Sequence, residues 1–203
     1  YEAYQLLDDD WTEIAVDLEI IQTEGTEAIK KVDPLMVTKK KGGKEQEVQD
    51  GWKGHIIPFE LVQNTILLEE KERIKDKENR LSEIASEYEE IFDSLTEEEK
   101  GFDFVSEDDW VISEVKRALK SDSIELETKE KLETIAKIND EEKSLKAEIK
   151  TKSALLETKT KDIIENLSDE QASELLKAKW IIPLIQNIMQ LPDRIIKELV
   201  ANI

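Results

Sequence analysis

Cysteine is absent from the 203-residue chain, and histidine, proline and glycine are scarce, at one, four and six residues. Without cysteine the chain can form neither a disulfide nor a thiolate metal site. A reducing cytoplasm is the natural home of such a sequence, and it is the location that we expect. The glycines form neither a Gly-x-Gly-x-x-Gly nor a Gly-x-x-x-x-Gly-Lys-Ser/Thr pattern, so the common phosphate-binding loops are missing from the sequence.

Long hydrophobic runs are missing as well. The most apolar stretch, Trp180–Ile185, is short and contains Pro183. We therefore expect no membrane span, and no signal peptide is recognisable. The sequence begins at Tyr1 rather than at methionine and opens in the middle of a pattern, which leads us to expect a piece of a longer protein.

Few residues are suited to catalysis or to binding a metal. His55 is the single histidine, and no nucleophile–base pair can be formed around it, so we expect a structural role. Asp8, Asp9 and Asp10 are consecutive and would point in different directions on a helix, which favours a solvated helix start over a metal site. The four tryptophans are expected to anchor a core or an interface: Trp11, Trp52, Trp110 and Trp180. We expect no cofactor and no metal in this chain.

Acidic charge dominates the sequence, with a formal net charge of −20. Residues 1–31 hold nine acidic and two basic side chains, whereas residues 32–57 hold four acidic and five basic ones. An acidic surface disfavours non-specific binding to DNA. Only the lysine-rich turn could contact phosphate, through Lys39, Lys40, Lys41 and Lys44. A solvated hairpin tip is the alternative for these lysines.

Two stretches of 29 residues carry apolar seams with the same 3-4-3-4 spacing. Such spacing keeps one helix face towards a partner helix, and each helix would be about 43 Å long. We expect the two helices to pair antiparallel, which brings Glu70 near Lys159 and Lys77 near Lys152. The two lysines would repel each other unless each reaches a neighbouring glutamate; otherwise the register differs or these residues face another partner. The first seam comprises Leu67, Ile74, Leu81, Ile84, Tyr88, Ile91 and Leu95, and the second comprises Ile135, Ile138, Leu145, Ile149, Leu156 and Ile163.

The remaining elements can be placed by their boundary signals. Asp10 with Glu13 predicts a helix start, and Gly25 interrupts that helix. Residues 35–48 are typical of a β-hairpin turning at Gly42–Gly43, and residues 51–55 of irregular structure. Pro58 opens a helix over about 58–96, Ser106 caps a short helix in the connector, and a second long helix covers about 124–167. Ser168 with Gln171 begins a C-terminal region that Pro183 and Pro192 divide into short helices.

The predicted fold is thus mainly α, a long antiparallel coiled-coil helical hairpin with a small β-hairpin and C-terminal short helices. Its parts are a helical linker with the β-hairpin (1–57), the coiled-coil hairpin with a short helix in its connector (58–167), and a C-terminal helical cluster (168–203). This cluster carries more apolar residues than one buried face can hide, which indicates a subunit interface. Alternatively, it packs back onto the long helices or onto residues 11–31. The interface candidates are Trp180, Ile181, Leu184, Ile185 and Ile188.

Two runs carry a family resemblance, Asp17-Leu-Glu-Ile-Ile-Gln-Thr-Glu-Gly25 and Gly51-Trp-Lys-Gly-His-Ile-Ile-Pro-Phe-Glu-Leu-Val-Gln63. With Val32-Asp33-Pro34 and the lysine hairpin between them, they resemble the C-terminal part of the modification (methyltransferase) subunit of type I restriction–modification systems. Residues 78–84 and 180–199 fit the same family.

The resemblance implies that the parent protein is an S-adenosylmethionine-dependent DNA adenine-N6 methyltransferase. The catalytic Asn-Pro-Pro-aromatic motif and the Gly-rich cofactor motif of this family do not occur here, so no catalytic or cofactor residue can be assigned to the chain. The implied partners are the specificity subunit, the restriction subunit and, through their complex, DNA. In this family the helical C-terminal region packs against the helical spacer of the specificity subunit and helps to enclose DNA.

Two other functions remain open on the sequence. One is a stand-alone coiled-coil scaffold, and the other is a nucleic-acid-binding module that uses the turn from Lys39 to Lys44. An Asn-Pro-Pro motif upstream in the full reading frame would favour the methyltransferase subunit over both.

A first prediction is that this chain by itself neither binds S-adenosylmethionine nor methylates DNA, because both motifs are missing from its sequence. Calorimetric titration of the chain with S-adenosylmethionine should give no heat of binding. A micromolar dissociation constant would contradict the prediction.

Overall fold

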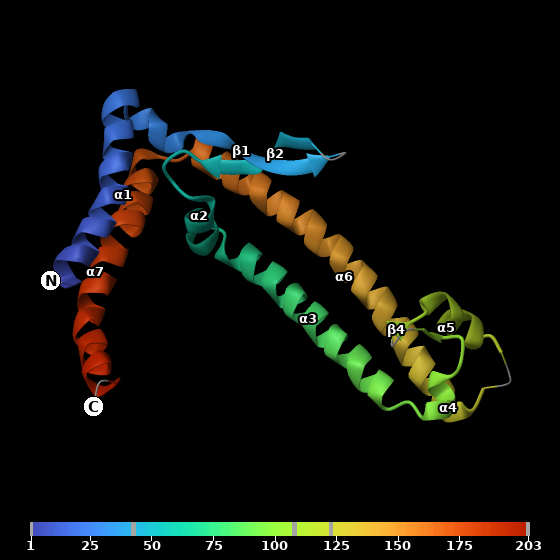
Figure 1. Ribbon diagram of the computed structural model, residues 1–203. Coiled ribbons are helices and arrows are strands. Elements are labelled where there is room, and N and C mark those ends of the chain that lie inside the picture. Colours follow the sequence, from blue (N-terminus) through green and yellow to red (C-terminus); the bar gives the residue numbers. More distant parts are fainter. Residues whose placement is uncertain (1, 42–43, 107–108, 122–123, 202–203) are drawn as a thin grey trace. The chain divides into compact units, whose positions relative to one another are not determined.

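The computed structural model describes residues 2–41, 44–106, 109–121 and 124–201, and it is mainly helical (Figure 1). Within these ranges the chain forms seven α-helices, one short 3₁₀ helix and two small antiparallel sheets. It divides into two compact units, the first comprising Tyr1–Lys71 with Leu155–Ile203 and the second Glu72–Ala154. None of the helices in the described ranges has the length and apolarity that a membrane crossing requires.

The first unit begins with helix α1 (Glu2–Glu24), so the predicted start at Asp10 is wrong. The Asp10–Glu13 spacing that suggests a cap also occurs within the helix. Gly25 interrupts the helical region as expected: its φ of 85° is one that residues with a side chain rarely adopt, and its N–H donates to Ile21 O at 2.9 Å. A 3₁₀ helix, η1 (Thr26–Lys30), leads from there into the β-hairpin.

The β-hairpin is longer than the expected residues 35–48. Strands β1 (Val32–Lys41) and β2 (Lys44–Gly54) pair antiparallel from Val32 opposite Gly54 to Lys41 opposite Lys44. The register shifts between Pro34 and Met36, and an irregularity of this kind tolerates a proline. The ladder pairs residues 52–54, and β2 continues through Gly51, so the irregular structure predicted for residues 51–55 is wrong apart from the register shift beside Gly51 and the bend at His55. The proposed turn residues Gly42–Gly43 lie outside the described residues.

Two glycines, Gly51 and Gly54, lie at the base of the β-hairpin where neighbouring groups leave no room for a Cβ atom. Gly51 has φ 90°, and the Oε1 of Glu157 accepts a hydrogen bond from the Trp52 N–H at 2.9 Å. A Cβ on Gly54 would lie 1.7 Å from the carbonyl oxygen of Ile57, a distance that a rigid backbone cannot accommodate. Glu157 belongs to helix α6 (Leu126–Glu165), so the end of α6 holds the base of the hairpin.

The core of the first unit gathers apolar side chains from η1, the turn after β2, helix α2 (Phe59–Thr65), α6 and the first turns of helix α7 (Asp169–Ala201). In α6 the buried face follows Leu156, Thr160 and Ile164, and the last two are fully buried. The predicted seam residue Ile163 is only half-buried, because steps of four residues replace the expected step of seven here. The fully enclosed members of this core are Ala28, Ile57, Val62 and Ile164.

The helix predicted for residues 58–96 is in fact two helices, α2 (Phe59–Thr65) and α3 (Leu68–Asp93). It is interrupted where Leu67 N–H bonds Val62 O, five residues back, at 3.1 Å. Pro58 does precede the first helix directly, as predicted. The predicted contact of Glu70 with Lys159 is confirmed by an ion pair of 3.2 Å.

In the second unit α3 and α6 contact each other antiparallel. Ile84, Ile138 and Leu145 form a buried cluster, and Arg80 binds the Glu141 carboxylate through two hydrogen bonds of 2.8 and 3.0 Å. Lys77 pairs with Glu148 at 2.7 Å, and the charge of Lys152 acts on the same carboxylate, so a glutamate lies between the two lysines that the predicted register brings together. The charges therefore follow the antiparallel order as the apolar residues do.

Helix α7 is one helix of 33 residues, so the predicted division of the C-terminal region into short helices is wrong. Pro183 and Pro192 lie inside it. Each proline removes one backbone donor, and helical turns on both sides keep theirs. The predicted start is confirmed: Gln171 N–H donates to Ser168 Oγ at 3.2 Å, and Ser168 N–H donates to Gln171 Oε1 at 3.0 Å.

The connector of the second unit holds more structure than the predicted short helix. It forms α4 (Glu97–Lys100), a minimal hairpin of β3 (Val105–Ser106) and β4 (Asp109–Trp110), and α5 (Ile112–Ala118). Ser106 lies in β3, and Val111 precedes the helix instead, so the predicted cap is wrong. Trp110 packs edge-on against Phe92 and stacks on Phe104, which fills the core at this end with aromatic rings.

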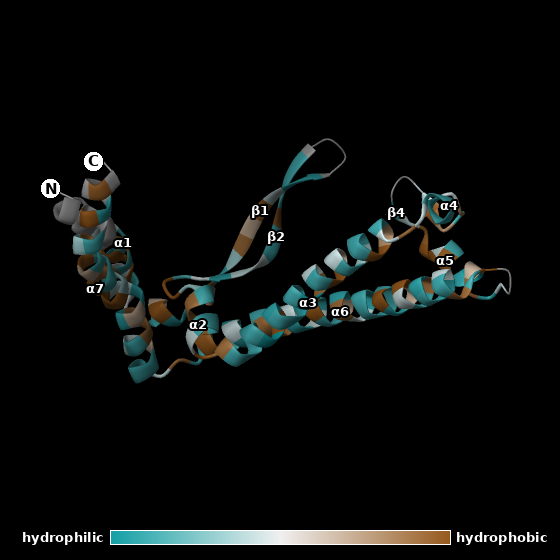
Figure 2. Ribbon diagram, turned by 90° about the horizontal axis from the view of Figure 1, so that it is seen from below, coloured by the Kyte–Doolittle hydropathy of each residue, from teal (hydrophilic) through white to brown (hydrophobic). Residues whose placement is uncertain are grey.

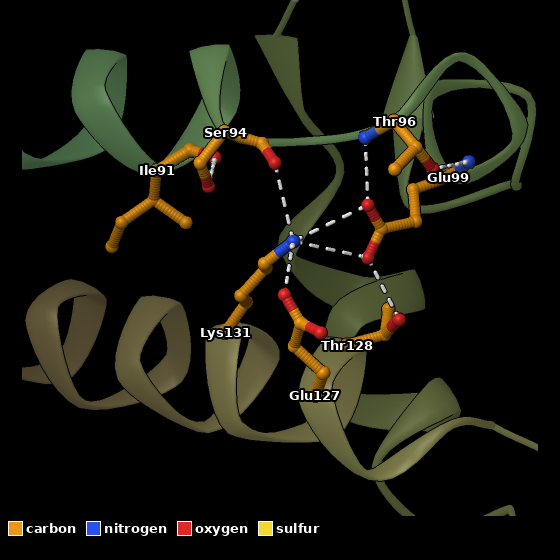
Figure 3. A network of polar contacts seen from close by, with 7 residues as sticks. All are labelled: Ile91, Ser94, Thr96, Glu99, Glu127, Thr128 and Lys131. Carbon is orange, nitrogen blue, oxygen red and sulfur yellow. Dashed lines mark hydrogen bonds and ion pairs between the residues drawn. The ribbon is translucent and has the colours of Figure 1, made fainter.

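Glu99 is a buried carboxylate that joins α4 to α6 (Figure 3). It accepts hydrogen bonds from Thr96 N–H at 2.7 Å and Thr128 Oγ1 at 2.7 Å, and Lys131 Nζ lies 3.3 Å from both its oxygens. Burial alone would raise the pKa of Glu99, but the hydrogen bonds from Thr96, Thr128 and Lys131 outweigh it and lower the pKa to about 2. The ionised form is therefore the one that stabilises the fold.

We predict that Glu99→Gln lowers the free energy of unfolding by about 1.5–3 kcal/mol at pH 7, the usual range for a hydrogen bond to a charged group. An unfolded glutamate has a pKa of about 4.3, so the contribution is complete above that pH and is lost as the pH falls towards 2. Urea unfolding should show the difference between the two proteins closing over this interval. The exposed neighbour Glu98 is the control, since Glu98→Gln should change little, and a constant difference down to pH 2 would contradict the prediction.

Candidate docking surface on helices α1 and α7

A buried carboxylate joins α7 to α1. Asp17 on α1 is 7% exposed, and it accepts hydrogen bonds from Trp180 Nε1 at 2.8 Å and from Lys179 Nζ. Lys179 Nζ also donates to the Ile56 carbonyl oxygen at 2.8 Å. A carboxylate out of water requires such donors, because an unpaired buried charge costs several kcal/mol. Asp17 thereby fixes the position of α7 against α1 and the turn after β2.

Beyond this contact, α7 keeps an apolar face in solvent. Ile181, Ile185 and Ile188 are 45–50% exposed, and they continue at helical spacing towards Met189, which is 74% exposed. Figure 2 shows apolar bands recurring along α7. Helix α1 adds Trp11, 59% exposed, at its own surface. We call the exposed residues of α7 the α7 face: Ile181, Ile182, Ile185, Ile188, Met189, Ile196 and Val200.

The structure separates the five residues predicted as an interface into two groups. Trp180 and Leu184 are half-buried, and Trp180 turns towards α1, so for Trp180 the alternative of packing onto residues 11–31 holds. Ile181, Ile185 and Ile188 belong to the exposed α7 face. A contiguous apolar surface of this kind is typical of a site for a partner.

Sequence reasoning missed the continuation of this face through Ile196 and Val200. The four-residue spacing of these residues was visible in the sequence. The assumption that Pro183 and Pro192 end the helix concealed it.

The lysine-rich turn is a surface of mixed charge. Lys39 Nζ pairs with Asp50 Oδ1 at 3.0 Å, and Lys40 lies opposite Glu45 in the ladder. The side chains of Lys41 and Lys44 lie outside the described residues. Acidic residues of β2 thus offset the lysines that can be described, which weakens their attraction for phosphate.

A metal site at Asp8, Asp9 and Asp10 is the less favoured expectation, and the side chains of these three residues lie outside the described part of the structure. Elsewhere in the described ranges no group of three or more His, Asp or Glu side chains is placed to hold a metal ion.

Comparison with protein-family models, with curated proteins and with solved structures finds no match for this chain.

We predict that Asp17→Asn lowers the free energy of unfolding by about 2–3 kcal/mol, because it removes the charge that Lys179 pairs with while both groups stay buried. Trp180→Phe removes the second donor, and its effect should not add to that of Asp17→Asn, since the two residues share one interaction. Urea unfolding of the single and double variants measures both effects. Glu19→Gln, on the exposed side of α1, should change stability by less than about 0.5 kcal/mol; equal losses for Asp17→Asn and Glu19→Gln would contradict the prediction.

Proposed function

We propose that this chain is the C-terminal assembly domain of a type I restriction–modification DNA adenine-N6 methyltransferase subunit, and that it docks onto the specificity subunit. The family assignment is supported by the resemblance of residues 11–63. The docking role is supported by the apolar α7 face, whose members are about half exposed or more.

The α7 face is the observation on which the docking role rests. Removing apolar surface from water contributes roughly 25 cal/mol per Å², and a stripe with three- and four-residue spacing suits a partner helix. The helical spacer of the specificity subunit, expected from the family resemblance, would be such a partner. S-adenosylmethionine and the methylated adenine would be bound by other parts of the parent protein.

The long antiparallel coiled-coil hairpin is also part of the proposal. In the first unit Glu70 meets Lys159, and in the second Lys77 meets Glu148 and Arg80 meets Glu141. These pairs support the antiparallel register that the two seams predict.

The β-hairpin of β1 and β2 carries both lysines and acidic residues, and this mixed charge favours docking over nucleic-acid binding as the function of the chain. Lys39 is paired with Asp50, and Lys40 faces Glu45. A stand-alone scaffold would also expose an apolar face, so the identity of the partner distinguishes it from the proposed subunit.

We predict that Ile185→Asp abolishes co-purification of the chain with a co-expressed specificity subunit, because it places a charge in the middle of the α7 face. Gln186→Asp is the matched control, since it adds the same charge at the next, already polar, exposed position and should leave co-purification intact. Circular dichroism should be unchanged in both variants. Undiminished co-purification of Ile185→Asp and of Ile188→Asp would refute docking through this face.

A further inference from the structure

We propose that His55 is a proton-dependent clasp that holds the end of α1 to the base of the β-hairpin. Its ring lies where three segments meet: Glu24 is the last residue of α1, Asp33 lies at the start of β1, and His55 follows the end of β2. This role goes beyond the proposed docking function and does not depend on it.

Both ring nitrogens of His55 face carboxylates. Nδ1 lies 2.8 Å from Asp33 Oδ2, and Nε2 lies 3.4 Å from Glu24 Oε1. The side chain is only 20% exposed. The backbone N–H of His55 donates to the Lys31 carbonyl oxygen at 3.0 Å. This bond fixes the position from which the ring reaches both carboxylates.

This arrangement matches the imidazolium ion. A neutral imidazole carries one N–H and one lone pair, whereas the cation carries two N–H groups. In the neutral ring one nitrogen would therefore direct a lone pair at a carboxylate. Nε2 is buried and makes no hydrogen bond to the described residues, and it faces the Glu24 carboxylate at 3.4 Å, an arrangement that a protonated Nε2 favours and a lone pair does not.

The charged groups around the ring come from each neighbouring segment. Glu24 and Asp33 are the acidic groups at the ring. Of the basic groups nearby, Lys31 pairs with Glu24 at 2.6 Å, and Lys53 lies opposite Asp33 in the ladder. From α7, Lys179 reaches the carbonyl oxygen of Ile56, the next residue along, but it is paired with Asp17. Lys31 therefore shares the Glu24 carboxylate with the ring, and Lys179 is already paired with Asp17.

The pKa of His55 is raised above its ordinary value, in the first place by the hydrogen bond to Asp33; burial opposes this, and the charges of Asp33 and Glu24 add to it. Since the folded pKa lies above the unfolded value of about 6.5, the clasp stabilises the fold fully below that pH. Its contribution is lost as the pH rises through the folded pKa. Deprotonation would then release the end of α1 from the hairpin.

Proton NMR can test the clasp directly, because His55 is the single histidine of the chain and gives one Cε1–H titration curve. The curve should have its midpoint above 6.5, and both Asp33→Asn and Glu24→Gln should move it to lower pH. Asp50→Asn is the matched control, since Asp50 lies on the same hairpin but pairs with Lys39, and it should leave the midpoint in place. A midpoint at or below 6.5 in the unaltered protein, or one that neither carboxylate variant moves, would overturn the proposal.

Stability provides a second measurement. The melting temperature of the unaltered protein should exceed that of His55→Gln most at pH 5–6, and the difference should shrink as the pH is raised to 9. Over the same range the amides of Gly25 and His55, which close α1 and the hairpin base, should lose protection from hydrogen exchange once intrinsic rates are corrected for. A melting difference that is constant from pH 5 to 9 would show that the ring only fills space.

Discussion

The buried carboxylate of Asp17 is the interaction on which the first unit depends most. Its two donors, Lys179 and Trp180, come from α7, and Lys179 also holds the turn after β2. Hydrophobic burial in the surrounding core is larger in total, but it is non-directional and would tolerate small displacements of α7. Hydrogen bonds to a charged group out of water are directional, so they tolerate few displacements of the helix. Asp17 therefore selects one packing of α7 among several that the core could accept.

That packing also decides which apolar residues are left for a partner. Turning Trp180 towards α1 commits one side of α7 to the fold and leaves the α7 face in solvent. The proposed docking surface is therefore a consequence of internal packing. A helix that buries both sides would have no such surface, and one that buries neither would not be held in place.

Polar groups at the ends of elements recur as the means by which the local structure is fixed. Glu99 binds α4 to α6 through three neighbours, and His55 meets one carboxylate at the end of α1 and another at the start of β1. Both side chains are largely buried, and the pKa of Glu99 is lowered while that of His55 is raised, so both connect stability to pH, with opposite signs. The carboxylate of Glu99 loses its contribution in acid, and the imidazolium of His55 loses its contribution in base.

The sequence by itself determined the features that repeat or that lie close along the chain. The seams predicted two long helices and the Glu70–Lys159 pair, and Ser168 with Gln171 predicted the start of α7. Such signals are local or are repeated over many residues, so one exception does not erase them. Only the tertiary structure decided that α7 continues through Pro183, that Ile164 replaces Ile163 in the core, and that Asp17 is buried. Asp17 and Lys179 are 162 residues apart, and no period or cap links positions so distant. Their contact depends on how α1 and α7 pack, and that packing is set by all the side chains between them together.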